Sequence, residues 1–173
     1  EESTAFPMIT QPPEIGGLGF DFKWNMGWMH DILNYFSAPP YERSQLHENL
    51  TFGAIYQFSE NFIQAFSHDE VVYGKGSLAN KMNQASESDR LANLRSLISL
   101  QWTWPGKNTL FMGSEFGQWK EWNFETSLDW GLLNFRQHAG IRKLVADLNR
   151  LYLDHPTWAY SDHLADKFQW IDC

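Results

Sequence analysis

The 173 residues carry 21 acidic and 13 basic side chains, which gives a net charge of −8. This charge argues against a nucleic-acid partner, because phosphates require a basic face. The single cysteine excludes an intrachain disulfide framework, and no Cys/His spacing typical of a zinc site occurs. No apolar run approaches the length needed to cross a membrane, so we expect no membrane insertion.

Aromatic residues make up 16% of the chain, and nine of them are Trp. Large rings with polar edges suit stacking on sugar faces, but they also fill hydrophobic cores. We assign most of the Trp residues to packing and a minority to a sugar-binding groove.

In chain order, residues 5–22 are predicted to form a loop, because three prolines and three glycines interrupt them. Residues 24–36 predict an amphipathic helix, with large apolar side chains every four positions and Pro39-Pro40 at the end. Lys23, Trp24 and Asn25 stand at the junction of the two, where they either pack against the fold or face a substrate.

Residues 43–56 continue the helical pattern, and 62–66 form a short apolar run typical of a buried strand. This strand ends at Ser67-His68-Asp69-Glu70. The polar, glycine-rich segment that follows, 74–88, is predicted to be a loop with one helical turn at 78–82.

The second half of the chain repeats this order. We expect Asp89 to cap a helix that runs to about Trp102 and ends at Pro105-Gly106. Residues 109–112 then predict a second buried strand, which ends at Gly113-Ser114-Glu115. Helix, strand and polar strand end in succession are typical of consecutive α/β units.

An aromatic loop is expected over 116–130 and a helix over 141–152, while 168–171 indicate the first strand of another domain. In an α/β barrel, catalytic groups lie at the carboxyl ends of the strands. Acidic residues at a strand end also serve as caps or solvated loop residues. The residue types alone leave both interpretations of His68, Asp69 and Glu70 open.

Several stretches resemble the signature regions of the 1,4-α-glucan (glycogen) branching enzymes of the α-amylase superfamily. Residues 67–78, which end in Gly74-Lys75-Gly76-Ser77-Leu78, resemble the fourth region, and Glu1-Glu2-Ser3-Thr4 resembles the third. Further matches follow in order along nearly the whole chain, at 16–20, 23–31, 50–53, 105–107, 110–113, 121–123 and 127–130. The resemblance implies the C-terminal half of a TIM (β/α)8 barrel over 1–158 and the beginning of an all-β C-terminal domain over 159–173.

By this resemblance, Glu1 is the general acid/base that protonates the leaving glycosidic oxygen and then deprotonates the acceptor hydroxyl. Neighbouring strand residues face opposite ways, so only one of Glu1 and Glu2 can point at the substrate, and the family pattern favours Glu1. Asp69 matches the carboxylate that holds sugar hydroxyls and favours the oxocarbenium-like ring. His68 matches the adjacent histidine that binds the same sugar.

Trp24 and Glu115 are further candidates for lining the substrate groove. Glu70 is expected to be structural and paired with Lys75. Tyr73 departs from the family pattern, which often has His there, and residues 114–119 are also altered.

The resemblance implies an enzyme that cleaves an α-1,4-glucan and rejoins the piece through an α-1,6 linkage, with no metal and no cofactor. Glycogen or amylose would be its partner, and we expect a cytoplasmic monomer. The Asp nucleophile of the family belongs to an earlier signature region, so we expect this chain to be a fragment that is inactive alone. Two alternatives stay open: an amylase-family hydrolase such as a debranching enzyme, and a catalytically silent glucan-binding barrel.

Overall fold

A three-stranded parallel sheet lies at the centre of the fold. The computed structural model describes residues 5–160 and 163–171. The strands β1 (Lys23–Trp24), β2 (Phe62–Phe66) and β3 (Lys107–Leu110) lie side by side in chain order. All pairs are parallel, so the carboxyl ends of the strands point toward the same edge of the sheet. Strands β2 and β3 end level with each other, at Phe66 and Leu110, whereas β1 ends level with Ile63.

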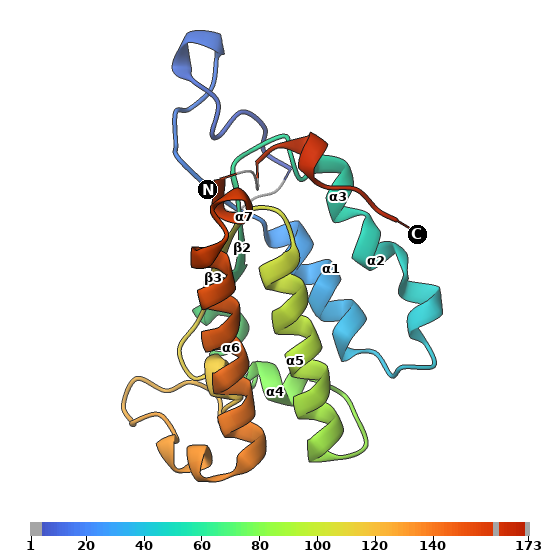
Figure 1. Ribbon diagram of the computed structural model, residues 1–173, viewed down its shortest axis with the longest axis vertical. Helices are drawn as coiled ribbons and strands as arrows, with labels where there is room; N and C mark the ends of the chain where they lie inside the picture. Colours follow the sequence, from blue (N-terminus) through green and yellow to red (C-terminus); the bar gives the residue numbers. More distant parts are fainter. Residues whose placement is uncertain (1–4, 161–162, 172–173) are drawn as a thin grey trace.

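Helices fill the connections between the strands. Figure 1 shows the two longest, α5 (Glu87–Thr103) and α6 (Arg136–Asp154), side by side, and α1 (Met26–Ser37) also contacts α5. The short α-helices are α2 (Glu48–Thr51), α3 (Gly53–Tyr56), α4 (Leu78–Lys81) and α7 (Pro156–Tyr160). The 3-10 helices are η1 (Pro13–Ile15), η2 (Arg43–Leu46), η3 (His68–Glu70), η4 (Ser114–Phe116), η5 (Trp130–Asn134) and η6 (Ala165–Lys167).

The first predicted helix is confirmed, but it begins two residues later than expected. Asn25 caps it by accepting a hydrogen bond from the backbone N–H of Trp28 at 3.1 Å. Residues 23 and 24 form β1, which pairs with β2. The N–H of Lys23 donates to the carbonyl of Asn61, just before β2, and the N–H of Asn25 donates to the carbonyl of Ile63 within β2. The sequence interpretation missed this strand, since two residues carry no periodicity.

The cap predicted for α5 is wrong by three residues. Ser86 is the N-cap: its hydroxyl accepts from the N–H of Asp89 at 3.1 Å and donates to the Asp89 carboxylate at 2.8 Å. The helix therefore begins at Glu87 and holds Asp89 in its first turn, where a carboxylate favours the positive end of the helix dipole.

Other boundaries moved as well. The strand predicted over 109–112 lies at Lys107–Leu110, because these residues pair with 63–66 of β2. Helix α6 exceeds the predicted 141–152 at both ends. Residues 43–56 form three short helical pieces, joined at His47 and Phe52 by residues that keep helical φ and ψ.

The core lies where α1 and α5 meet β2 and where α6 packs on α5. Trp28 of α1 lies 5.5 Å from Phe66 of β2 and 6.0 Å from Trp104, measured between ring centroids. A buried amide network crosses this layer: the Gln57 side-chain oxygen accepts from Gln64 at 2.9 Å and from Trp104 at 2.8 Å. Most buried polar groups in proteins are hydrogen-bonded, and this network links the sheet to the segments that follow α3 and α5.

At the carboxyl end of the chain, the strand predicted over 168–171 is absent from the described residues. Phe168 and Trp170 instead pack on Trp104, at ring distances of 5.7 and 6.0 Å. An all-β domain beginning at residue 159 stays a prediction. None of the described helices is both long and apolar enough to cross a membrane.

Candidate functional site

The segment that follows β2 forms the centre of the candidate site. Ser67 and Glu70 make a capping box around η3: the Ser67 hydroxyl accepts from the N–H of Asp69, and the Glu70 carboxylate accepts from the N–H of Ser67 at 2.5 Å. Glu70 is buried. These two side chains hold the turn, which leaves those of His68 and Asp69 available for other contacts.

His68 and Asp69 form a partly exposed polar pair. The imidazole Nε2 lies 3.3 Å from the Asp69 carboxylate, and the two side chains are 51% and 38% exposed. The ring of Phe111, from the chain beyond β3, lies 6.0 Å from the His68 ring and forms an apolar wall. An accessible carboxylate beside an imidazole and an aromatic wall can hydrogen-bond and orient a sugar.

A tight turn follows directly, over Val72-Tyr73-Gly74-Lys75. The Lys75 N–H donates to the Val72 carbonyl at 3.3 Å, and both central residues have positive φ, 58° at Tyr73 and 83° at Gly74. These features define a type I′ turn. The predicted pairing of Glu70 with Lys75 is wrong, because the Lys75 ammonium donates to the Asp69 carbonyl at 2.7 Å.

Glu121 clamps this turn from the loop that follows β3. Its two carboxylate oxygens accept from the backbone N–H groups of Gly74 at 2.9 Å and Gly76 at 2.7 Å. These hydrogen bonds, that from Gly74 first, hold the pKa of Glu121 below its usual value. The sequence interpretation missed this role. The two glycines of the turn leave backbone N–H groups that can donate to an acceptor, but the sequence does not identify Glu121 as that acceptor.

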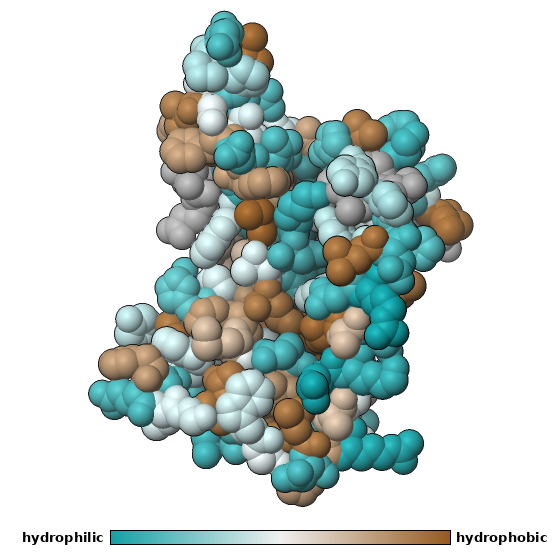
Figure 2. Space-filling view, turned by 60° about the vertical axis from the view of Figure 1, so that its left-hand side comes forward, coloured by the Kyte–Doolittle hydropathy of each residue, from teal (hydrophilic) through white to brown (hydrophobic). Residues whose placement is uncertain are grey.

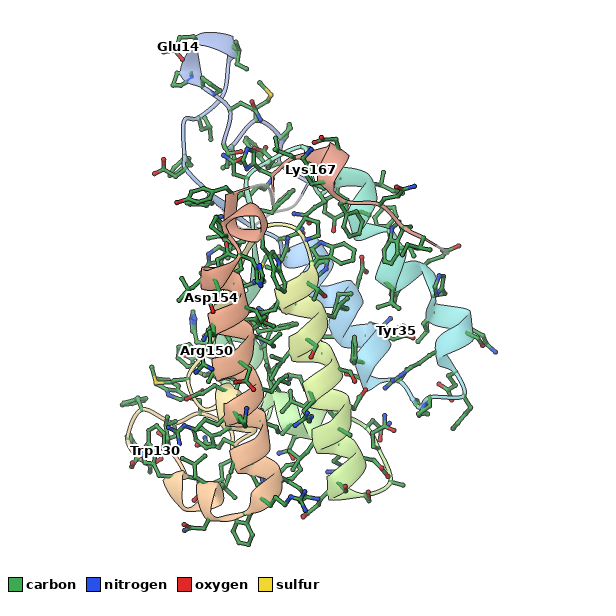
Figure 3. All side chains as sticks on the ribbon, in the orientation of Figure 1. Glu14, Tyr35, Trp130, Arg150, Asp154 and Lys167 are labelled. Carbon is green, nitrogen blue, oxygen red and sulfur yellow. The ribbon has the colours of Figure 1, made fainter. Side chains whose placement is uncertain are left out.

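The loop after β3 joins the same assembly. The N–H of Trp122 donates to the Val71 carbonyl at 3.1 Å, and its ring packs edge-on against Phe111 at 5.2 Å. Ser77 donates to the Trp119 carbonyl at 3.0 Å. Figure 3 shows Trp130 in this loop, toward the end of the molecule opposite Glu14. The loops after β2 and β3 therefore form one bonded unit.

The structure brings some of the predicted site residues together. Glu115 lies in η4, half-buried, and the N–H of Phe111 just before it donates to the Phe66 carbonyl at 2.8 Å. Glu115 therefore belongs to the same sheet edge as His68 and Asp69. Trp24 is half-buried in β1, at the level of Ile63 and so below this edge.

Glu1 and Glu2 lie outside the described residues, so their roles stay predictions. The described part of the chain holds no group of three or more His, Cys, Asp or Glu that could bind a metal ion.

The described surface around this edge is open. A cleft between the two loops measures about 10 Å³, far below the roughly 300–1,000 Å³ of typical ligand pockets. Figure 2, in which this side of the molecule comes forward, shows apolar side chains in separate patches among hydrophilic ones. A larger cavity of about 290 Å³ lies at the opposite edge, beside the starts of β2 and β3.

Glu60 marks that opposite edge, immediately before β2. Its carboxylate accepts from the N–H of Ile9 at 2.9 Å, from the N–H of Thr10 at 2.8 Å and from the Thr10 hydroxyl at 2.5 Å. Burial alone would raise the pKa of Glu60, but these hydrogen bonds and the nearby Lys23 place the pKa below its usual value. Glu60 is 7% exposed and anchors the 5–22 loop, a role that the sequence did not predict.

Comparison with known proteins gives the family. No protein-family model matches the chain. The 1,4-alpha-glucan branching enzyme GlgB 2 of Rhizobium johnstonii is 55% identical over 170 residues, which cover 98% of this chain and 23% of that protein. The GlgB enzyme of Aquifex aeolicus is 54% identical over 172 residues, 99% of this chain and 27% of that protein.

The corresponding enzyme of Pseudomonas fluorescens is 52% identical over 171 residues, 99% of this chain and 23% of that protein. The chain thus spans about a quarter of the length of the curated relatives it matches, and it matches them over practically all of its own length. By this similarity, the chain belongs to the family of the 1,4-alpha-glucan branching enzymes.

Proposed function

We propose that this chain is part of an enzyme that cleaves α-1,4-glucan and re-attaches the segment through an α-1,6 linkage. The observation that carries the proposal is the partly exposed His68–Asp69 pair at the carboxyl end of a parallel strand, in a chain 55% identical to a branching enzyme. The partner is an α-glucan such as glycogen or amylose. We further propose that the whole enzyme is a cytoplasmic monomer.

The finer fold proposal is the C-terminal half of a (β/α)8 barrel over 1–158. Three parallel strands in chain order, joined through helices, are the arrangement that such a barrel repeats. In the described residues β1 and β3 are the outer strands of the sheet, and an unpaired edge is a site where further strands can add. The strands of the rest of the barrel would pair there. The all-β domain from residue 159 is proposed on the family resemblance alone.

The chemistry follows the retaining scheme of glycosidases. An aspartate in the part of the enzyme that this chain does not cover would attack the anomeric carbon, while Glu1 gives its proton to the leaving glycosidic oxygen. Asp69 and His68 hydrogen-bond the sugar hydroxyls and favour the flattened ring of the transition state. A glucan 6-hydroxyl then gives its proton to the Glu1 carboxylate and attacks the anomeric carbon, which breaks the enzyme ester and frees the aspartate.

Within the same scheme, water in place of the 6-hydroxyl would give a hydrolase. The full-length enzyme, supplied with amylose, tests this choice. We expect new α-1,6 branch points with few new reducing ends. Reducing ends without branches would establish the hydrolase. The absence of both branches and new reducing ends would establish a silent glucan-binding barrel. Because catalysis needs residues outside this chain, we expect no turnover from the isolated 173 residues.

A further inference from the structure

Tyr73 has a conformation that its own packing does not explain. It is the first central residue of the type I′ turn, with φ of 58°, a position at which Asn or Gly is favoured and bulky side chains are uncommon. Its side chain is 92% exposed, and its ring contacts no aromatic ring among the described residues. An exposed ring at a strained position stabilises neither the core nor the turn, and such positions gather at functional sites.

The turn holds Tyr73 close to the polar pair. On one side, the Lys75 ammonium bonds to the Asp69 carbonyl at 2.7 Å. On the other, Glu121 accepts from the N–H groups of Gly74 and Gly76, the residues that follow Tyr73. The backbone of the turn is thus fixed from the Asp69 side and from the β3 loop, which holds the main chain of Tyr73 beside the polar pair.

We propose that Tyr73 is a stacking platform for a glucose unit of the α-1,4-glucan chain, next to the unit that His68 and Asp69 bind. This inference rests on the proposed function. A tyrosine ring matches the apolar face of a pyranose, and its hydroxyl can stay in water. Stacking on a unit beside the cleaved bond holds substrate and transition state equally, so Tyr73 should determine the KM for glucan and leave kcat nearly unchanged.

The decisive variant is Tyr73→Asn in the full-length branching enzyme. Asn tolerates positive φ, so the turn should keep or gain stability while the ring is lost. We expect the KM for amylose to rise roughly tenfold, the loss expected for one stacked apolar face, with an unchanged or higher Tm. Tyr73→Phe should keep the KM within about twofold, because it keeps the face of the ring.

Tyr41→Asn is the matched control. Tyr41 is 79% exposed and follows α1, and Figure 1 shows that segment across α5 from the loop after β3. The KM of the Tyr41→Asn enzyme for amylose should equal that of the wild type. An unchanged KM in Tyr73→Asn, or a rise in Tyr73→Phe as large as that in Tyr73→Asn, would overturn the stacking role. The proposed function fails separately, if the wild-type enzyme forms no branches from amylose.

Discussion

Two carboxylates at the opposite ends of β2 differ in what surrounds them. Glu60, before the strand, is 7% exposed and accepts three hydrogen bonds from Ile9 and Thr10. Asp69, after the strand, has a side chain that is 38% exposed, and the imidazole Nε2 of His68 lies 3.3 Å from its carboxylate. The first carboxylate is satisfied by the fold, whereas the second keeps acceptor capacity for a ligand.

This difference separates stability from function. A buried carboxylate with complete partners contributes to the folded state, and removal of its charge leaves donors unpaired. A partly exposed carboxylate that the fold does not require is free to serve substrate. We therefore expect a mutation of Asp69 to lower kcat with little change in stability, and a mutation of Glu60 to lower stability with little change in kcat.

The largest effect is expected for Asp69→Asn in the full-length enzyme. The amide keeps the size of the side chain but removes the charge that favours the oxocarbenium-like sugar. We expect kcat for branching to fall roughly 10³-fold, as for the loss of one transition-state contact. The free energy of unfolding should change by less than about 0.5 kcal/mol. A variant that loses activity only because it unfolds would remove Asp69 from the site.

Glu60→Gln should show the reverse. The amide presents an NH₂ group to donors that now bond to a carboxylate oxygen, and bonds to charged groups are worth about 1.5–3 kcal/mol each. We expect a loss of roughly 2–4 kcal/mol in the free energy of unfolding, measured in urea, with kcat retained in the folded fraction. A fall in kcat without a loss of stability would assign Glu60 to catalysis.

The role of Glu60 in stability can also be tested through the pH dependence of unfolding. The pKa of Glu60 lies below its usual value in the folded state, so its stabilising contribution is complete above the unfolded pKa of about 4.5. It is lost as the pH falls through the folded pKa. Wild-type stability should therefore drop more steeply below about pH 4.5 than that of Glu60→Gln, in thermal unfolding followed across pH. Parallel curves would contradict the assignment.

A smaller effect is expected for Glu121→Gln, which keeps one acceptor for two N–H donors. The turn around Tyr73 should loosen, and kcat/KM should fall about tenfold, because misplaced site residues lose orientation. Glu125→Gln is the control, an exposed glutamate in the same loop. If kcat/KM is the same in both variants, the hydrogen bonds from Gly74 and Gly76 to Glu121 do not contribute to activity.

Local pattern predicted the parts of the fold that depend on local contacts. The strand at 62–66 was predicted with its observed bounds, and the helices α1, α5 and α6 were each located, because apolar periodicity marks them. His68 and Asp69 are adjacent in the sequence, so their closeness at 3.3 Å follows from the chain itself, whereas their role stays a prediction.

Long-range partners left no such pattern. Glu60 bonds to residues 50 and 51 positions away, and Glu121 reaches residues 45 and 47 positions away. Strand β1 exists only through its pairing with β2. Such contacts depend on how distant segments meet, which periodicity and motif spacing do not encode.

The most direct test is a crystal structure of the full-length enzyme with a bound maltooligosaccharide. We expect a glucose ring between Glu1 and Asp69, with sugar hydroxyls about 3 Å from the Asp69 carboxylate. No sugar should lie near Glu60. A glucan chain bound at the Glu60 edge of the sheet, with Asp69 and His68 free of sugar, would contradict the account.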